Sequence, residues 1–127
     1  MEAPFLVFVL GCNCFFQKAK NMACMSGSVD AVAKRNSDVR VPIIGWHNTY
    51  VREGAPLFDG VDVPSFYFVH SYECLPEDKQ LISSHIQVVD TSICASVTKG
   101  QTMGVQFHPE KSGTCGLKFL QNFISTT

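Results

Sequence analysis

The sequence predicts an α/β fold in which a mixed β-sheet is flanked by helices. Residues 5–10 form a continuous apolar run closed by Gly11, a pattern typical of a strand covered on both faces. Several shorter strand-like runs follow, and residues 112–124 carry apolar side chains at helical spacing. The chain has 127 residues, 46% of them hydrophobic and 17% charged, so residues 1–127 suit one domain around one core.

Charge and cysteine content exclude several classes of function. A net charge of −1 gives no electrostatic basis for binding nucleic acid or an anionic membrane. No apolar run is long enough to cross a bilayer, and residues 1–4 carry no basic side chain, so we expect no signal peptide. The six cysteines are irregularly spaced without a C-x-x-C pair, namely Cys12, Cys14, Cys24, Cys74, Cys94 and Cys115. We therefore expect reduced thiols in a cytoplasmic protein with no metal and no cofactor.

The first element in the chain is the strand at residues 5–10. Gly11 then allows a sharp turn, and residues 12–24 contain the alanines, lysines and apolar side chains of a helix. Strand, sharp turn and helix in this order form a nucleophile elbow, which lifts a reactive side chain above the sheet.

The middle of the chain predicts short strands separated by loops. Residues 24–40 suit a loop or small hairpin with a weak strand at 28–33, and residues 41–46 suit a strand that begins at an edge because of Pro42. Residues 53–64 suit a loop, in which Leu57 and Phe58 reach into the core. The aromatic and β-branched residues 66–72 predict a further strand.

The last third predicts two hairpins and a helix. Strands are expected at residues 86–90 and 92–97, with turns at Asp90-Thr91 and at Lys99-Gly100, and then at residues 103–107. Ser112 or Thr114 can cap the closing helix, whose apolar face we expect to lie on the sheet behind the preceding strand. That face comprises Leu117, Leu120 and Ile124, with Phe119 and Phe123 beside them.

The end of the 103–107 strand carries a pair of residues with catalytic potential. Pro109 cannot continue a paired strand, so the chain turns with His108 at the strand end and Glu110 two residues later. A carboxylate that holds a histidine fixes its tautomer and stabilises the imidazolium formed when a thiol or hydroxyl loses its proton. The spacing alone favours a solvent-facing histidine and a surface glutamate in a turn, since His-x-Glu pairs are common.

Residue identity adds a family resemblance to this spacing. Residues 106–112, Gln-Phe-His-Pro-Glu-Lys-Ser, resemble the His/Glu motif of the class I, triad-type glutamine amidotransferases. The Gly-Thr-Cys-Gly-Leu at 113–117 is similar to one branch of that family, the glutaminase subunits of imidazole glycerol phosphate synthase. Residues 41–46 and 66–72 resemble the same branch in the expected order. The resemblance covers essentially the whole chain, but only the later two-thirds of a usual member.

The resemblance implies a flavodoxin-like fold and a glutaminase that supplies ammonia for histidine biosynthesis. The partner it implies is a (β/α)₈-barrel synthase (cyclase) subunit, and glutamine is the substrate. It assigns a catalytic role to His108 and Glu110, substrate binding to Gln17, His70, Ser71 and Tyr72, and the partner interface to Trp46 and Tyr67. From the residues alone, the alternatives are core packing for Trp46 and a buried aromatic strand with a satisfied histidine for residues 66–72.

The elbow departs from the family pattern, in which a cysteine nucleophile sits in Gly-x-Cys-x-Gly-x-Gln. The preferred register keeps residues 10–11 and Gln17 aligned with the family and puts Asn13 at the nucleophile position. The other register puts Val9 there. Neither supplies a cysteine, so the neighbouring Cys12 is the fallback nucleophile.

The family's first βα unit and its oxyanion-hole strand also have no counterpart ahead of residue 5. Loss of these oxyanion donors together with the nucleophile predicts glutaminase activity reduced to near background. Loss of neighbouring strands predicts exposed strand edges that favour self-association. The sequence leaves three readings open: an active glutaminase, a catalytically dead fragment (a pseudoenzyme) that acts as a binding protein, and a piece of a longer protein.

Overall fold

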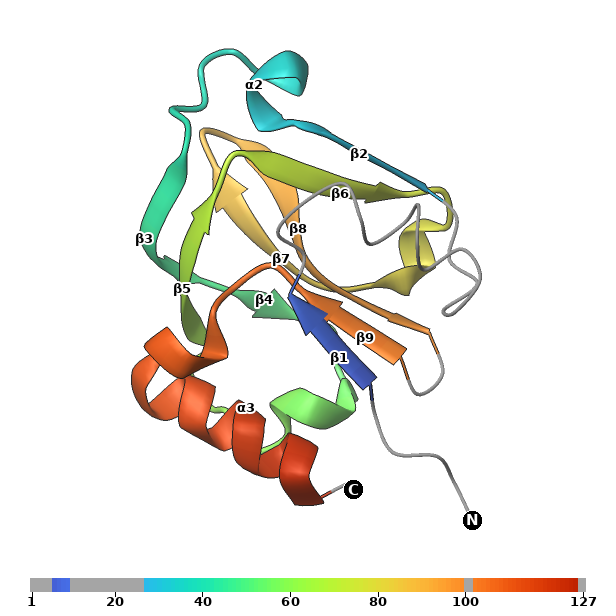
Figure 1. Cartoon of the computed structure of the whole chain (residues 1–127), viewed down its shortest axis with the longest axis vertical. Coiled ribbons are helices and arrows are strands. Elements are labelled where there is room, and N and C mark those ends of the chain that lie inside the picture. The colour runs from blue at the N-terminus through green and yellow to red at the C-terminus, as the bar shows by residue number, and fades with distance from the viewer. Residues whose placement is uncertain (1–5, 10–26, 100–101, 126–127) are drawn as a thin grey trace.

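The structure, a computed structural model, describes residues 6–9, 27–99 and 102–125, with only the backbone described for 6–9 (Figure 1). Nine strands and five helices or 3₁₀ turns are present in these residues. The strands are β1 (Leu6–Val9), β2 (Gly27–Ala31), β3 (Ile43–Asn48), β4 (Tyr50–Val51), β5 (Ser65–His70), β6 (Tyr72–Pro76), β7 (Ile82–Val88), β8 (Thr91–Lys99) and β9 (Thr102–Val105). The helices are α2 (Val32–Arg35) and α3 (Gly113–Ser125), and the 3₁₀ turns are η1 (Pro56–Phe58), η2 (Lys79–Leu81) and η3 (Pro109–Lys111).

The main sheet has five strands in the order β1-β9-β8-β7-β4. β1 pairs parallel with β9, whereas the other neighbours pair antiparallel, so the sheet is mixed. Two further antiparallel ribbons, β2 with β6 and β3 with β5, lie beside it (Figure 1). The predicted α/β class with a mixed sheet is confirmed.

Aromatic side chains fill the core between β5, η1 and α3. Along β5 the side chains alternate, so Phe66 and Phe68 are fully buried while the residues between them point the other way. Phe66 stacks on Phe107 with ring centroids 4.1 Å apart, and Phe119 of α3 lies 5.4 Å from the ring of Phe107. Leu57 and Phe58 of η1 are buried in this cluster, as the sequence predicts.

The closing helix is confirmed, and its predicted apolar face is confirmed in part. Phe119 is buried and Phe123 packs against the core, whereas Leu117 and Ile124, expected on the same face, are 57% and 67% exposed. The helix packs on β5, η1 and η3, and its Phe119 contacts Phe107 just before His108 (Figure 1). The reason for this orientation is the close approach at Gly116, where a Cβ atom would lie 1.9 Å from the carbonyl oxygen of Pro109. That contact turns the face with Gly116, Phe119 and Phe123 inward, at helical spacing.

Several strand boundaries differ from the prediction. The 66–72 run is split at Ser71 into β5 and β6, and β9 ends at Val105, two residues before the expected end. The β7–β8 turn is confirmed, and there Val89 and Asp90 adopt left-handed φ values of 49° and 59°. The second hairpin is shown by the pairing of Lys99 with Thr102. In the described residues no helix is both long and apolar enough to span a membrane.

Candidate active site

The parallel pairing of β1 and β9 brings together the ends of the two strands that precede the predicted site residues. Leu6 pairs with Thr102 and Val9 with Val105, so both strands end at the same edge of the sheet (Figure 1). His108 follows Val105 by three residues, and the predicted elbow follows Val9 directly. The last backbone position of β1 is therefore level with the start of the segment that leads to His108. Asn13, Cys12 and Gln17 themselves lie outside the described residues.

The backbone of His108 is fastened to β5. Its N–H donates to the carbonyl of Tyr67 over 3.0 Å, and its carbonyl accepts from the N–H of Lys111 over 3.0 Å. The hydroxyl of Ser112 donates to the same carbonyl at 2.6 Å and accepts from the N–H of Tyr67 at 2.9 Å. Ser112 is fully buried, so these bonds are shielded from water. The turn therefore holds the backbone of His108 in one place relative to β5.

The side chains of His108 and Glu110 meet as the spacing suggests. Nδ1 of His108 lies 3.3 Å from Oε1 of Glu110, and the two side chains are 31% and 56% exposed. When the imidazole is neutral, this contact favours a proton on Nδ1, which leaves the lone pair on Nε2. The pair can thus act as a general base whose protonated form the carboxylate stabilises.

His70 lies at the end of β5 in an enclosed position. It is 8% exposed, and its Nδ1 lies 2.8 Å from the carbonyl oxygen of Tyr72, which can only accept, so Nδ1 carries the proton. Its Nε2 is buried and has no hydrogen-bond partner in the part of the chain that the structure describes. Burial lowers the pKa of His70 below its ordinary value, and the charges of His47 and His108 act in the same direction. His70 is therefore a neutral histidine with an acceptor nitrogen available to a ligand N–H.

The other two predicted substrate residues are more open. Ser71 is half-buried between β5 and β6, and its carbonyl accepts from the N–H of Val32 at 2.9 Å. Tyr72 is 49% exposed. His70, Ser71 and Tyr72 are neighbours because they are consecutive in the chain, and their role in binding a substrate stays a prediction.

The predicted interface residues lie on the outer face of the β3–β5 ribbon. Trp46 is paired with Tyr67, and their rings meet edge to face with centroids 6.1 Å apart. Trp46 is 55% exposed, so core packing of this tryptophan is wrong. Ile44 and Val69, the pair two positions along on the same face, are 58% and 41% exposed. Four apolar or aromatic side chains thus form a surface strip.

Sequence reasoning missed two contributors to this region. It treated Ser112 only as a helix cap, although the Ser112 hydroxyl bridges β5 and the His108 turn. The sequence signal for such a bridge is a serine four residues after the carbonyl to which it can donate. It gave no role to His47, which packs edge to face on Phe68 at 5.8 Å and whose pKa is lowered by burial. Only the tertiary contact reveals that histidine.

Comparison with known proteins places these features in a family context. The family model described as "Glutamine amidotransferase class-I" matches residues 4–126. The chain is 38% identical over 109 residues to the imidazole glycerol phosphate synthase subunit HisH of Pelagibacter ubique, covering 85% of this chain and 52% of that protein. It is 41% identical over 106 residues to the subunit of the same name from Methanosarcina acetivorans, covering 79% and 52%.

The fold is also similar to that of solved structures. PurLQS from Thermotoga maritima matches with a TM-score of 0.61 at 19% identity, over 87% of this chain and 57% of that one. The identity is low, so this likeness concerns the fold alone. The chain spans about half the length of the curated relatives that it matches first.

Proposed function

This chain belongs to the class-I glutamine amidotransferases, and from that premise we propose that it acts as a glutaminase of the imidazole glycerol phosphate synthase type. It would hydrolyse glutamine to glutamate and ammonia, and the ammonia would be used in histidine biosynthesis. The names of the relatives support this activity, and because the chain covers about half of their length it is stated here as a proposal.

The observation that carries the proposal is the shared edge of β1 and β9. Their register puts Val9, the last residue of β1, level with Val105, which precedes His108 of the His108–Glu110 pair by three residues. In this proposal a thiol in the segment after Val9 faces a base held by a carboxylate, which is the arrangement that nucleophilic attack on an amide requires.

The chemistry follows from these roles. His108 takes the proton of a thiol, for which Cys12 is the candidate in this chain, and the thiolate attacks the side-chain amide carbon of glutamine. The protonated imidazole then gives its proton to the leaving nitrogen, so that ammonia departs and a thioester remains. His108 next activates a water molecule that hydrolyses the thioester to glutamate and restores the thiol. Glu110 keeps the imidazole oriented throughout.

The remaining predicted residues complete the binding site and the interface. His70 offers its buried Nε2 to an N–H of the substrate, with Ser71 and Tyr72 next to it in the chain, and Gln17 is assigned to substrate binding by the family resemblance. The strip formed by Trp46, Tyr67, Ile44 and Val69 would contact a (β/α)₈-barrel synthase subunit, since an exposed aromatic strip is typical of interface centres. A cytoplasmic location is supported by the free thiols of Cys74, Cys94 and Cys115.

The test is release of glutamate from glutamine by the purified chain, alone and with a synthase subunit. We expect His108→Ala to reduce turnover by a factor of about 10²–10⁴, the usual contribution of a general base. Cys12→Ala should abolish it. The matched control is His85→Ala, at a half-buried histidine that stacks on Tyr50 away from the site.

The outcomes separate the remaining readings. Turnover that survives both Cys12→Ala and His108→Ala would refute the assigned roles. A chain without any turnover that still binds the synthase subunit, and loses that binding in Trp46→Ala, would be a binding protein and not a glutaminase.

A further inference from the structure

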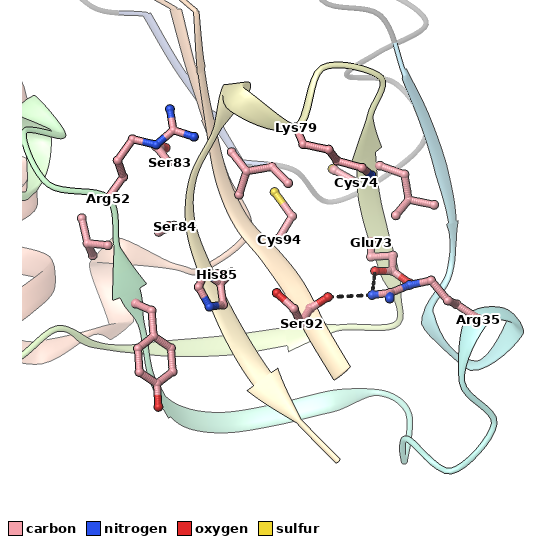
Figure 2. Close-up of a pocket in the computed structure, with 14 residues that line it drawn as sticks. Arg35, Arg52, Glu73, Cys74, Lys79, Ser83, Ser84, His85, Ser92 and Cys94 are labelled. Carbon is pink, nitrogen blue, oxygen red and sulfur yellow. Dashed lines mark hydrogen bonds and ion pairs between the residues drawn. The ribbon is translucent and has the colours of Figure 1, made fainter. Parts of the chain in front are cut away.

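A second hollow lies away from His108, over the β7–β8 hairpin and beside β6 (Figure 2). Its volume is about 560 Å³, within the range of about 300–1,000 Å³ typical of small-molecule sites. Its described lining comes from α2, β4 and the residue after it, β6, η2, β7 and β8, and includes neither His70 nor His108. It is therefore a separate site from the one proposed above.

One wall of this pocket is an ion pair that is already satisfied. Arg35 donates from Nε to Oε2 of Glu73 at 2.9 Å and from Nη2 to Oε1 at 2.7 Å. The same Nη2 also donates to the carbonyl of Ser92 at 2.7 Å. Glu73 is 1% exposed and is the one carboxylate in the described lining, so its charge is compensated within the wall.

Two cations of the lining have no such partner. Arg52 and Lys79 come from opposite sides of the pocket and flank its upper part (Figure 2). Among the described residues neither is in an ion pair, although Arg52 donates from Nη1 to the carbonyl of Gln80, which fixes its guanidinium. The described lining therefore carries two positive charges outside any ion pair, and such charges attract an anion.

Hydroxyl groups gather at an irregularity in the pocket floor. The pairing of β7 with β8 shifts at Ser84, where Ser83 and Ser84 both face Ser96. The hydroxyl of Ser96 lies 2.6 Å from that of Ser83 and 2.5 Å from that of Ser84, and Thr98 donates to Ser83 at 2.9 Å. Bulges of this kind are frequent beside binding sites, where they redirect side chains. Ser83 and Ser84 also line the pocket and can exchange hydrogen bonds with a polar ligand.

The thiols in this pocket do not suit covalent chemistry. Burial raises the pKa of Cys74 to about 12, and it raises the pKa of Cys94 as well. Both thiols are therefore protonated at neutral pH, and a protonated thiol is a poor nucleophile. No group of three or more metal-ligating side chains occurs in the described part of the chain. A ligand here would be bound reversibly by charge and hydrogen bonds.

We propose that this pocket binds a small phosphate monoester of sugar-phosphate size. The phosphate binds at Arg52, because a guanidinium can bind two phosphate oxygens at once, and Lys79 on the opposite side of the pocket adds a second attractive charge. The hydroxylated part of the ligand lies over Ser83 and Ser84. This proposal does not depend on glutaminase activity.

The test is calorimetric titration of the purified chain with ribose 5-phosphate, inorganic phosphate and ribose. We expect saturable binding of the sugar phosphate, weaker binding of inorganic phosphate and none of ribose. The double variant Arg52→Gln/Lys79→Gln should weaken the sugar phosphate by about tenfold or more, because it removes both charged contacts. The matched control Arg40→Gln/Lys118→Gln removes two exposed cations outside the pocket and should bind as the parent chain does.

Other results would overturn the proposal. Equal weakening in the control pair would show non-specific attraction, and equal affinity for ribose would show that the phosphate is not recognised. Titration without saturation would show that there is no site. Circular dichroism verifies the fold of each variant. If the double variant is unfolded, the affinity of the single variant Lys79→Gln for the sugar phosphate replaces it as the test.

His108→Ala should bind the sugar phosphate as the parent chain does, because His108 is not in this pocket. Loss of glutaminase activity can therefore be told apart from loss of sugar-phosphate binding.

Discussion

The two ends of this molecule are stabilised in different ways. The end that carries the His108 turn is built from rings, with Phe58, Phe66, Phe107 and Phe119 in mutual contact at centroid distances of 4.1–6.3 Å. The end that carries the second pocket contains polar groups, with the Arg35–Glu73 ion pair and a cluster of serine hydroxyls, and it borders an open pocket.

The comparison shows what each kind of packing is suited to. Ring packing is dense and non-directional, so it provides a rigid base for a turn whose position matters. Polar contacts are directional and hold side chains apart at fixed distances, which leaves a hollow with charged walls. A substitution that removes a ring should therefore leave a cavity, whereas the loss caused by breaking the ion pair should be recovered by replacing both of its members.

The largest effect is expected at the aromatic end. Phe107 is fully buried and contacts Phe58, Phe66, Phe68 and Phe119. Phe107→Ala should lower the free energy of unfolding by about 3–5 kcal/mol, because it leaves a cavity among rigid rings. Urea denaturation measures this loss. Leu117→Ala, at a helix position that is 57% exposed, is the control and should change it by less than about 0.5 kcal/mol. Similar losses in both variants would contradict the proposed core.

A smaller loss of stability, which a second substitution should recover, is expected at the polar end. Arg35→Ala leaves the buried carboxylate of Glu73 unpaired, and it should cost about 2–3 kcal/mol because the arginine side chain is 42% exposed and water can partly replace it. Arg35→Met/Glu73→Leu should recover most of that loss, since no unpaired charge remains. If the double variant is no more stable than Arg35→Ala, the loss does not arise from the buried charge.

The hydroxyl of Ser112 connects the aromatic end to the catalytic turn. Ser112→Ala removes its bonds to the carbonyl of His108 and the N–H of Tyr67 and should cost about 1–3 kcal/mol. Amide hydrogen exchange at Tyr67 should become faster. Thr114→Ala, at an exposed position in the first turn of α3 two residues later, serves as the control. Unchanged exchange at Tyr67 would show that the bridge does not protect this amide.

The smallest effect is the pH dependence that comes from buried histidine. The pKa of His70 is lowered by burial, so below about pH 6.5 the unfolded chain binds more protons than the folded one. Stability should therefore fall as the pH falls, by at most about 1.4 kcal/mol per pH unit for one such group. His70→Gln should flatten this slope between pH 7.5 and 5.5, as measured by thermal unfolding at each pH. An unchanged slope would assign the dependence to another group.

Much of the fold could be predicted because its signals are local. Apolar runs located β1, β3, β5 and β9, and Pro109 fixed the turn that puts Glu110 beside His108. The orientation of α3 could not be predicted, because its apolar residues permit more than one inward face. The contact of Gly116 with Pro109 selects among them. The buried position of Glu73 gave no local signal either, since its partner lies 38 residues away.

The sequence by itself determined the α/β class, the family and the His108–Glu110 pair, because each depends on residues close together in the chain. The tertiary structure decided the rest. It aligned Val9 with Val105, bound Ser112 to Tyr67 45 residues away and placed Arg52 and Lys79 on either side of one pocket. These relations depend on strand register and on contacts distant in sequence, which the packing of the whole domain selects and no single segment specifies.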